Sequence, residues 1–315
     1  MHQLLQEDIP LAPLTTMKVG GPAKRFADVT SEEELLEALH LARENDWPIF
    51  ILSGGSNVIF SDDGFEGLVI KNNINFFEIN GTKITAGAAT DMSKLVDESI
   101  AAGLEGLEWA GGLPGTLGGA IRGNAGAFGS EIKNTVLAVK SIEIETGKNL
   151  ERTGEDCKFA YRESIFKQKK EVIVSATLQL KQGNTEELRK AADDHIEYRK
   201  EKHPVELPCS GSFFKNTPLD KVPTSELPTF EQAIKTDPMP VVPTAYIIAQ
   251  AGLSGLQIGQ AQVSPKHTNY IVNLGSAKSS DIIELANKVK EEVKNKFKID
   301  IELEPEIVPS HKPTE

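Results

Sequence analysis

One stretch of the sequence is rich in glycine and apolar residues together. It runs from 110 to 120 (AGGLPGTLGGA) and continues from 123 to 129 (GNAGAFG). Glycine has no side chain and tolerates positive φ, so its backbone N–H groups can approach a ligand closely. The stretch is therefore predicted to be a cradle for a phosphate or pyrophosphate. A flexible linker is the ordinary alternative, but linkers place serine, lysine or glutamate between their glycines, whereas leucine, isoleucine, alanine and phenylalanine stand here.

A second glycine loop, SGGSN at 53–57, follows the apolar segment at 48–52. Loops at strand ends are the usual place for ligand contacts, so we expect the two loops to hold two parts of one long cofactor. Neither has the G-x-G-x-x-G spacing of dinucleotide-binding folds, and no G-x-x-x-x-G-K-[ST] motif occurs in the chain. The cradle is therefore predicted to differ from both familiar nucleotide-binding signatures.

Length and composition indicate a globular protein with more than one domain. A chain of 315 residues is long for one core, and 39% hydrophobic and 25% charged residues are ordinary values. A net charge of −12 disfavours nucleic acid and anionic membranes as partners, although a local basic pocket could still bind a phosphorylated small molecule. Two cysteines, no signal-peptide pattern and no bilayer-length apolar run predict a cytoplasmic protein.

The glycine loops are predicted to lie among mixed strands and helices. A capping box at 31–34 begins a helix that should run to about 45, and a second helix is expected from 91 to 102. The turn Asn80-Gly81 predicts a hairpin. Strands are expected at 25–29, 48–52, 67–70, 76–79, 84–86, 136–139, 142–144 and 171–178. Strands outnumber helices, so this half is predicted to be α+β.

A domain boundary is predicted near 183, where a turn precedes a polar helix from 185 to 202. A tight turn entering a strand is expected at 208–216, and the proline-rich stretch from 217 to 243 is predicted to be an irregular surface excursion. Further helices are expected at 245–251 and 279–296, and further strands at 268–272 and 299–303.

Seven short motifs, in order along nearly the whole chain, resemble those of the UDP-N-acetylenolpyruvoylglucosamine reductase family, flavoenzymes that make UDP-N-acetylmuramate for bacterial peptidoglycan. Each motif alone is a weak signal, but seven in the family's order are a strong one. They are Thr15-Thr16 before Val19-Gly20-Gly21, Gly54-Gly55-Ser56-Asn57, Pro114-Gly115-Thr116 with Gly118-Gly119, Asn124-Ala125-Gly126-Ala127, Tyr161-Arg162-Glu163-Ser164, Gly211-Ser212-Phe213-Phe214-Lys215-Asn216 and Leu303-Glu304-Pro305-Glu306.

The resemblance implies an α+β fold with two domains. An FAD-binding domain of the vanillyl-alcohol-oxidase (PCMH) type would occupy 1–182, with a leader at 1–14. A smaller α+β substrate-binding domain would occupy 183–315. The implied cofactors are noncovalent FAD and NADPH, and the implied partner is a small nucleotide sugar; a monomer is expected.

The implied reaction has two stages: NADPH reduces FAD, and the flavin then passes hydride to the enolpyruvyl group of UDP-N-acetyl-3-O-(1-carboxyvinyl)-glucosamine. Hydride at the terminal carbon leaves negative charge on the carbon that bears the carboxylate, and a proton must then quench that charge. By resemblance, Arg162 stabilises the charge through its guanidinium fork, and Ser212 donates the proton. Glu306 either polarises the same carboxylate or serves as the acid.

The resemblance also implies binding residues, and no metal. For FAD these are Ser53, Gly54, Gly55, Ser56, Asn57, Pro114, Gly115, Thr116, Gly118, Gly119, Asn124 and Gly126. For the substrate they are Tyr161, Lys215, Asn216 and His267. His267 is explained nearly as well as a buried histidine whose hydrogen bonds are made within the core. Either Lys200 or Lys202 could bind the diphosphate of the substrate.

The chain departs from the family pattern at four places. After Glu306 it lacks the arginine that members commonly carry, and Gly259-Gln260 stands where a glycine pair is common. The excursion from 217 to 243 is longer than expected, and the tyrosine-bearing insertion expected between Leu178 and Ser212 is missing, as in a shorter subtype. Two alternatives stay open. One is a flavin oxidase of the same fold acting on a hydroxy acid or sugar, although the histidine that often tethers FAD there is absent from 53–57; the other is a flavin-binding protein without turnover.

Overall fold

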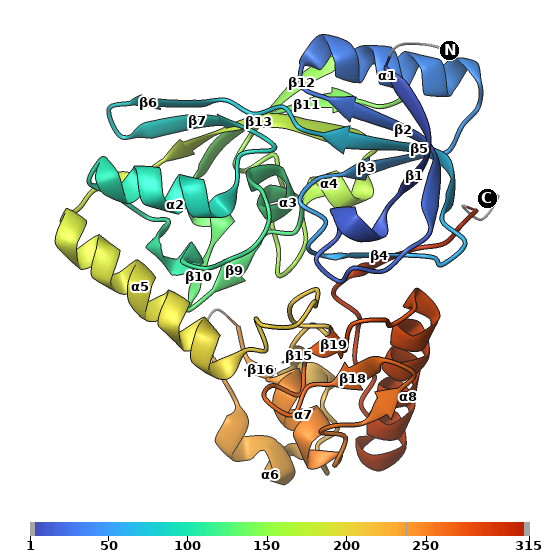
Figure 1. Cartoon of the computed structure of the whole chain (residues 1–315). Helices are drawn as coiled ribbons and strands as arrows, with labels where there is room; N and C mark the ends of the chain where they lie inside the picture. The colour runs from blue at the N-terminus through green and yellow to red at the C-terminus, as the bar shows by residue number, and fades with distance from the viewer. Residues whose placement is uncertain (1–3, 237–238, 312–315) are drawn as a thin grey trace. The chain divides into compact units, whose positions relative to one another are not determined.

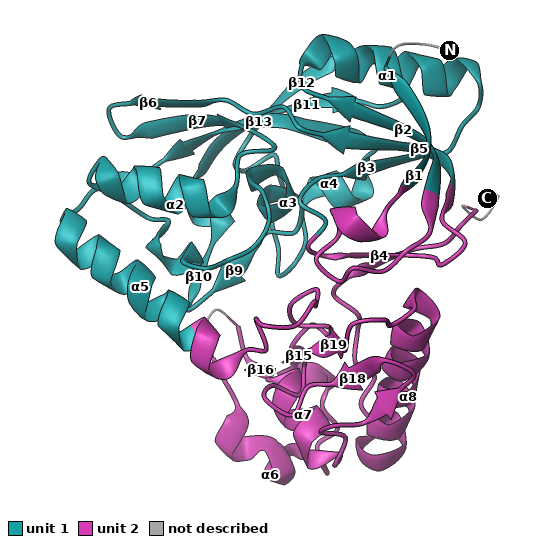
Figure 2. Ribbon diagram, in the orientation of Figure 1, with its two compact units in different colours: residues 1–9, 23–55, 66–198 teal, residues 10–22, 56–65, 199–315 magenta. Residues whose placement is uncertain are grey.

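The computed structural model describes residues 4–236 and 239–311 and divides into two compact units (Figures 1 and 2). Unit 1 comprises residues 1–9, 23–55 and 66–198, and unit 2 comprises residues 10–22, 56–65 and 199–315. Residues 1–3 of the expected leader and residues 237–238 of the expected excursion lie outside the described residues. Both units mix helices and strands, which confirms the predicted α+β class.

The first sheet of unit 1 has four strands in the order β1-β2-β5-β3, and β3 runs parallel to β5. Its strands are β1 (Leu5–Pro10), β2 (Pro22–Val29), β3 (Ile49–Leu52) and β5 (Phe65–Asn72). Helix α1 (Glu32–Glu44) begins as predicted, because the Ser31 hydroxyl accepts the Glu34 N–H at 3.2 Å. The buried leucines and alanines of α1 pack with β2 and β5 into one hydrophobic cluster. The first glycine loop starts directly after β3.

The second sheet of unit 1 has five antiparallel strands in the order β12-β11-β13-β7-β6. Their bounds are β6 (Phe77–Asn80), β7 (Lys83–Gly87), β11 (Val136–Glu143), β12 (Asn149–Thr153) and β13 (Glu171–Gln179). The hairpin at Asn80-Gly81 is confirmed. The two strands predicted at 136–139 and 142–144 are one strand, because β11 stays paired with β13 across the polar residues Lys140 and Ser141 despite a register shift there.

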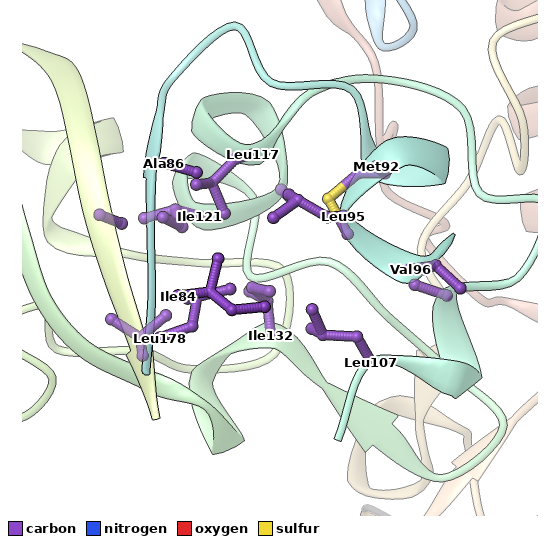
Figure 3. Packing of buried hydrophobic residues seen from close by; sticks show 14 of the residues in the cluster. Ile84, Ala86, Met92, Leu95, Val96, Leu107, Leu117, Ile121, Ile132 and Leu178 are labelled. Carbon is purple, nitrogen blue, oxygen red and sulfur yellow. The ribbon is translucent and has the colours of Figure 1, made fainter. Parts of the chain in front are cut away.

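Helices α2 (Met92–Ala101) and α3 (Leu117–Arg122) pack against this sheet. Figure 3 shows Met92 and Leu95 of α2 and Leu117 of α3 in the same cluster as Ile84 and Leu178 of the strands. This core fixes the second glycine stretch, because α3 begins inside it. The shorter elements of unit 1 are β8 (Leu104–Glu105), β9 (Gly126–Ala127), β10 (Ser130–Glu131), α4 (Ile165–Gln168) and β14 (Lys181–Gln182).

Helix α5 (Thr185–Lys202) has the predicted bounds, and most of its residues belong to unit 1. It is polar along most of its length and buries only Leu188 and Ala192. Gly111 allows it to pack closely, since a Cβ at that position would lie 2.5 Å from the Ala192 carbonyl oxygen. No helix in residues 4–236 or 239–311 is long and apolar enough to cross a membrane.

Unit 2 is organised around helix α8 (Ser279–Phe297), which buries an apolar stripe as predicted. Strands β17 (Gln257–Ile258), β18 (Ala261–Val263) and β19 (Ile271–Asn273) form an antiparallel sheet, and their residues join those of α7 (Thr244–Gln250) and α8 in one core. Strands β4 (Val58–Phe60) and β20 (Glu306–Val308) pair in parallel, so residues far apart in the sequence meet here.

Two predictions for unit 2 are wrong. The stretch from 217 to 243 contains β15 (Thr217–Pro218), α6 (Leu227–Phe230) and β16 (Val241–Val242), and it contributes to the core. Phe230 is fully buried against the ring of Phe297, at 5.1 Å between centroids. The strand predicted at 299–303 is also not formed: an isolated bridge joins Leu303 to Phe214, and the closing strand is β20.

The start of α8 receives its cap from a distant segment. The Asp62 carboxylate accepts the N–H groups of Ser279 at 2.7 Å and Ser280 at 3.0 Å, and the Ser280 hydroxyl at 2.8 Å. Burial, the largest single effect, raises the pKa of Asp62, but the hydrogen bonds from Ser280 and Ser279 together outweigh it and lower the pKa below its ordinary value. The ionised carboxylate is therefore the form that stabilises the fold.

We expect Asp62→Ala to lower the free energy of unfolding by about 1 to 2 kcal/mol at neutral pH, the usual effect of losing a helix cap. Because folding depresses the pKa of Asp62, the loss in free energy of unfolding should reach its maximum above the ordinary aspartate pKa. The loss should shrink as the pH falls through the pKa of the folded state. Urea unfolding at several pH values measures it. Asp63→Ala removes an exposed neighbour and is the control; an equal loss in both variants would contradict the capping role.

Candidate functional site

The two glycine loops meet within unit 1. A Cβ on Gly54 would lie 2.9 Å from the Cα of Gly115, closer than ordinary side chains come to backbone. The hydroxyls of Ser53 and Thr116 hydrogen-bond to each other across the same contact. The two loops, which are separated in sequence, are therefore in contact backbone to backbone, and their joint role as a cradle stays a prediction.

Part of the second glycine stretch serves packing instead of ligand approach. The N–H groups of Leu117 and Gly118 already donate to the carbonyls of Thr90 and Ala88, both at 2.9 Å. A Cβ on Gly118 would lie 2.9 Å from the Cβ of Ala88. The expectation that the whole run offers N–H groups to a ligand is thus too broad: at 117 and 118 they hold α3 against the segment before α2.

A lysine that the sequence analysis did not single out supports the first loop. The ammonium of Lys71, on β5, donates to the carbonyl oxygen of Ser53. Burial lowers the pKa of Lys71, and the nearby Asp28 carboxylate offsets part of that shift. Lys71 therefore places its ammonium group at a loop that is predicted to hold a pyrophosphate. Its position in a strand, 18 residues after the loop residue it contacts, gives no signal in the sequence.

We expect Lys71→Met to weaken FAD binding about 10-fold, because one charge-assisted hydrogen bond that fixes the loop is lost. Fluorescence titration of the flavin-free protein with FAD measures the affinity. Lys24→Met, which removes an exposed lysine from β2, is the matched control and should bind FAD as the wild type does. Equal affinities for Lys71→Met and the control would show that the lysine contributes nothing to the cradle.

The Asn124 side chain is fully buried and organises the loop after α3. Its amide donates to Glu131 Oε1 at 3.1 Å and to the carbonyl of Ala160 at 2.8 Å. The backbone at Asn124 has φ +42°, which asparagine tolerates better than most residues. The side chain thus connects the Gly126 loop to the segment that carries Arg162.

Arg162 lies in unit 1, in a strained conformation. Its φ is +57°, and its Nη2 donates to the carbonyl of Gly126 at 3.0 Å. Lys167 Nζ donates to the Arg162 carbonyl at 2.6 Å, and the guanidinium carbon lies 5.0 Å from the ring centroid of Tyr161. A non-glycine residue in the left-handed region is uncommon, and the hydrogen bonds with Gly126 and Lys167 hold Arg162 there. The structure therefore brings Tyr161 and Arg162 next to the predicted FAD loop at Gly126.

Unit 2 places Ser212 and Glu306 on neighbouring segments. The Glu304 N–H donates to the Phe213 carbonyl at 3.0 Å, one residue after Ser212. The Glu306 N–H donates to the Asn57 carbonyl at 3.0 Å, and the Asn57 amide donates to the Glu304 carbonyl at 3.1 Å. Three predicted site residues that are far apart in sequence, Asn57, Ser212 and Glu306, thus belong to one hydrogen-bonded group of segments.

Ser210, two residues before Ser212, is buried, and its hydroxyl has no hydrogen-bond partner among the residues that the structure describes. A buried hydroxyl without a partner costs about 1 to 3 kcal/mol. This turn is therefore not optimised for stability alone, as expected of a segment with a functional role.

Lys215 and Asn216 continue the Ser212 segment. Thr244, at the start of α7, donates its hydroxyl to the Lys215 carbonyl at 2.6 Å, and its N–H donates to Asn216 Oδ1 at 3.3 Å. The ammonium of Lys215 lies 3.7 Å from a carboxylate oxygen of Glu302. Both residues are only half-buried, so they can reach a ligand while their backbone is fixed.

His267 lies in a cluster with two residues that the sequence analysis did not assign to the site. Its ring meets those of His203 and Tyr270 at centroid distances of 5.1 and 4.8 Å. Burial lowers the pKa of His267. Tyr270 was a detectable candidate, because a tyrosine in a predicted strand needs a partner for its hydroxyl when it is buried. His203, at the end of a polar helix, carries no such signal.

The cradle in unit 1 fits the FAD that the sequence predicts. The backbones of Gly54 and Gly115 are in contact, and the hydroxyls of Ser53 and Thr116 lie at this contact. The Lys71 ammonium donates to the Ser53 carbonyl of the first loop. Backbone N–H groups, hydroxyls and a cation are the donors that a dinucleotide pyrophosphate requires. Among the described residues there is no group of three or more His, Cys, Asp or Glu side chains that could hold a metal ion.

Comparison with known proteins first identifies the class. Residues 23–151 match the family described as an FAD binding domain, and this range includes both glycine loops. The chain is therefore a member of the FAD-binding proteins with an α+β flavin unit.

The particular family follows from the rest of the chain. Residues 203–308 match the C-terminal domain of UDP-N-acetylenolpyruvoylglucosamine reductase. Enzymes of that name from Carboxydothermus hydrogenoformans and Caldanaerobacter subterraneus are 38% and 36% identical, over 96% and 95% of this chain and 93% and 91% of theirs. The crystal structure of the enzyme from Thermus caldophilus matches with a TM-score of 0.78 and 30% identity, over 97% of this chain and all of that one. The chain belongs to the UDP-N-acetylenolpyruvoylglucosamine reductase family.

Proposed function

We propose that this protein uses NADPH and FAD to reduce the enolpyruvyl group of UDP-N-acetyl-3-O-(1-carboxyvinyl)-glucosamine, giving UDP-N-acetylmuramate for peptidoglycan. The observation that carries the proposal is the arrangement of unit 2, in which Ser212 and Glu306 lie on hydrogen-bonded neighbouring segments. When bound, FAD would supply the hydride-transfer chemistry between NADPH and the terminal carbon of the enol ether. Ser53, Gly54, Gly115 and Thr116 would hold it, together with the other loop residues predicted above.

The three proposed catalytic residues act on the charge that hydride addition creates. As hydride adds, the electron pair of the carbon–carbon double bond moves to the carbon that bears the carboxylate. Arg162, whose guanidinium is always cationic, stabilises that charge, and the Ser212 hydroxyl transfers its proton to the carbon. Glu306 polarises the same carboxylate or serves as the acid. The hydrogen bond from Arg162 Nη2 to the Gly126 carbonyl supports its role, since it holds the guanidinium beside the predicted FAD loop.

The substrate would be bound by Tyr161, Lys215, Asn216 and His267, of which the last three lie in unit 2. We propose that residues 1–182 carry the flavin function and 183–315 the substrate function, and that the protein acts as a cytoplasmic monomer without nucleic-acid or membrane partners. Helix α5 occupies most of the interval between Leu178 and Ser212, where an inserted tyrosine loop would otherwise lie. Another element must therefore close over the bound substrate.

Anaerobic spectroscopy of the purified protein tests the proposal. We expect a yellow protein whose flavin is released by acid precipitation, is bleached by NADPH, and is re-oxidised stoichiometrically by the enolpyruvyl sugar nucleotide. NADPH consumption in air should depend on that sugar. Rapid oxygen-dependent consumption without it would favour an oxidase, and a flavin that stays reduced when the sugar is added would refute the proposed reaction.

A further inference from the structure

One edge of the segment that follows Ser212 is paired with residues 302–304 of the same unit. The Phe213 carbonyl accepts an N–H from that stretch at 3.0 Å, and the Lys215 N–H donates to one of its carbonyls at 2.9 Å. Between them, Phe214 forms an antiparallel bridge with the same stretch. Since alternate residues of an extended chain bond to a given neighbour, the N–H and carbonyl of Phe214 face the opposite edge.

The side chain of Asn269 occupies that opposite edge. Its Oδ1 accepts the Phe214 N–H at 3.0 Å, and its Nδ2 donates to the Phe214 carbonyl at 2.8 Å. The backbone carbonyl of Asn269 also accepts the Phe213 N–H at 2.6 Å. An amide has one acceptor and one donor group, so it can satisfy both polar groups of a single backbone residue as a neighbouring strand would. Asn269 therefore takes the place of a strand beside the two phenylalanines.

These hydrogen bonds are buried in the core of unit 2. Asn269 is 3% exposed, and Phe213 and Phe214 are 0% and 1% exposed. Buried backbone groups need a partner within the protein, and leaving them without one is costly. If the amide of Asn269 were removed, the N–H and carbonyl of Phe214 would lose their partners, and the segment would have to shift to find others.

The position of Ser212 depends on this contact more than the position of Lys215 does. Besides its N–H bond to 302–304, Lys215 has a carbonyl that accepts the Thr244 hydroxyl at 2.6 Å, so a third segment also holds its backbone. On the other side of Ser212, Gly211 has φ +78°, and a Cβ there would meet no atom of the described chain within 4 Å beyond its immediate neighbours. The placement of Ser212 is therefore set mainly by the residues that follow it.

We propose that Asn269 is a positioning residue for Ser212: by fixing the main chain at residues 213–214, its amide holds the serine hydroxyl where it can give its proton to the substrate carbon. This inference rests on the proposed function, in which Ser212 is the proton donor. A displacement of about 1 Å at a reacting group can cost about 100-fold in rate, so a contact made two residues away can control the reaction. Asn269 needs no contact with the substrate for this role.

Half-reaction kinetics of Asn269→Ala test the proposal. We expect NADPH to bleach the flavin at the wild-type rate, and re-oxidation by the enolpyruvyl sugar to slow by roughly 10- to 100-fold. The KM for the sugar should change less than kcat, because Lys215 keeps its other contacts. Replacing H2O by D2O should slow re-oxidation more in the variant than in the wild type, because transfer of the serine proton becomes the slower step. A loss of stability alone would not change this isotope effect.

Asn273→Ala is the matched control within the same unit. Asn273 is 2% exposed; its Nδ2 donates to the Met17 carbonyl at 3.0 Å, and its Oδ1 accepts the N–H groups of Gly275 at 2.8 Å and Ala277 at 2.9 Å. This variant therefore loses at least as many side-chain hydrogen bonds as Asn269→Ala, and none of them is made to the two phenylalanines. It should lower the urea midpoint comparably and leave both half-reactions within a few-fold of the wild type. Equal slowing of re-oxidation in the two variants would overturn the proposal.

A double variant tests whether Asn269 acts through Ser212. If it does, adding Asn269→Ala to Ser212→Ala should slow re-oxidation no further, because the hydroxyl that Asn269 positions is already absent. A second slowing of the size seen for Asn269→Ala alone would show that Asn269 acts on another group and would overturn the assignment to Ser212.

Asn269→Ser is a milder variant that decides the question if the alanine variant does not fold. Serine leaves room for a water that can bridge the Phe214 groups, so less stability is lost, but its hydroxyl cannot hold both groups as the amide does. We expect the same pattern, with re-oxidation slowed by roughly 5-fold or more. Re-oxidation within twofold of the wild type in either folded variant would overturn the proposal. Failure of the wild-type flavin to be re-oxidised by the sugar would instead refute the proposed function itself.

Discussion

Ser212→Ala is expected to lower kcat for the enolpyruvyl sugar by roughly 10²- to 10⁴-fold while NADPH still reduces the bound flavin at the wild-type rate. The substitution removes only the hydroxyl, because the backbone around it is fixed by Phe213, whose N–H donates to Asn269 and whose carbonyl accepts from Glu304. Hydride transfer then has no proton to complete it, so the slow step moves to the second half-reaction. Anaerobic stopped-flow absorbance measures the two half-reactions separately.

Ser210→Ala is the matched control for that experiment. Its hydroxyl is buried two residues away and makes no hydrogen bond within the described residues, so its loss should leave turnover within a few-fold of the wild type and should not lower stability. If Ser212→Ala lost flavin reduction as well, or if both variants lost turnover equally, the proton-donor role would be misassigned.

Gly54→Val should weaken FAD binding by more than about 100-fold. Even a methyl group at this position would lie 2.9 Å from the Cα of Gly115, and this backbone atom cannot move aside as the end of a flexible side chain can. The loops must separate, which breaks the Ser53–Thr116 hydrogen bond and opens the cradle. Overpacking of this kind costs about 1 to 3 kcal/mol, so a lower melting temperature should accompany the loss of flavin. The absorbance of flavin that co-purifies with the protein gives the first measurement.

Gly123→Ala provides the comparison within the same glycine-rich stretch. Its φ is −90°, and a Cβ there would meet the Gly119 carbonyl at an ordinary 3.5 Å, so this variant should fold and retain FAD. Retention of FAD at wild-type affinity by Gly54→Val would show that the two loops need not touch to bind the cofactor. Loss of FAD from both variants would indicate general sensitivity of the stretch.

Local signals predicted most of the helices. Ser31 marks the start of α1, Gly103 follows α2 with a positive φ of +65°, and the apolar stripe of α8 is the face that it buries. These features depend on residues within a few turns of one another, which is the range over which capping and periodicity act. The fold class followed from them, since mixed elements of this kind indicate α+β packing.

The errors arose where distant segments determine the structure. Strand β12 is short, polar and at the edge of its sheet, so it has no apolar alternation to detect. Strand β20 exists because β4 offers it a parallel partner nearly 250 residues earlier, and Phe230 is buried because α8 lies beside a stretch that its prolines made look irregular. The intrinsic propensity of a segment contains no information about partners that are distant in the sequence.

The predicted site shows the same division. Glycine loops could be found from composition, because a bare backbone is itself the signal. Lys71 and His203 could not be found, since each matters only through a contact made across the fold. Composition also cannot distinguish two structural roles of the glycines. Gly54 allows the two loops to approach each other, whereas Gly118 allows α3 to pack against Ala88.

The parallel pairing of β4 with β20 has a consequence for biosynthesis. Several hydrogen bonds tie early segments of unit 2 to late ones, among them those of Thr16 with Cys209, Met17 with Asn273, Asp62 with Ser279 and Ser61 with Val308. At about 5 to 20 residues per second, roughly 12 to 50 s of translation separate Phe60 from Val308. Throughout that delay, apolar residues such as Ile59 have no partner strand. The parallel pairing of β4 can therefore form only after residues 306–308 have been synthesised.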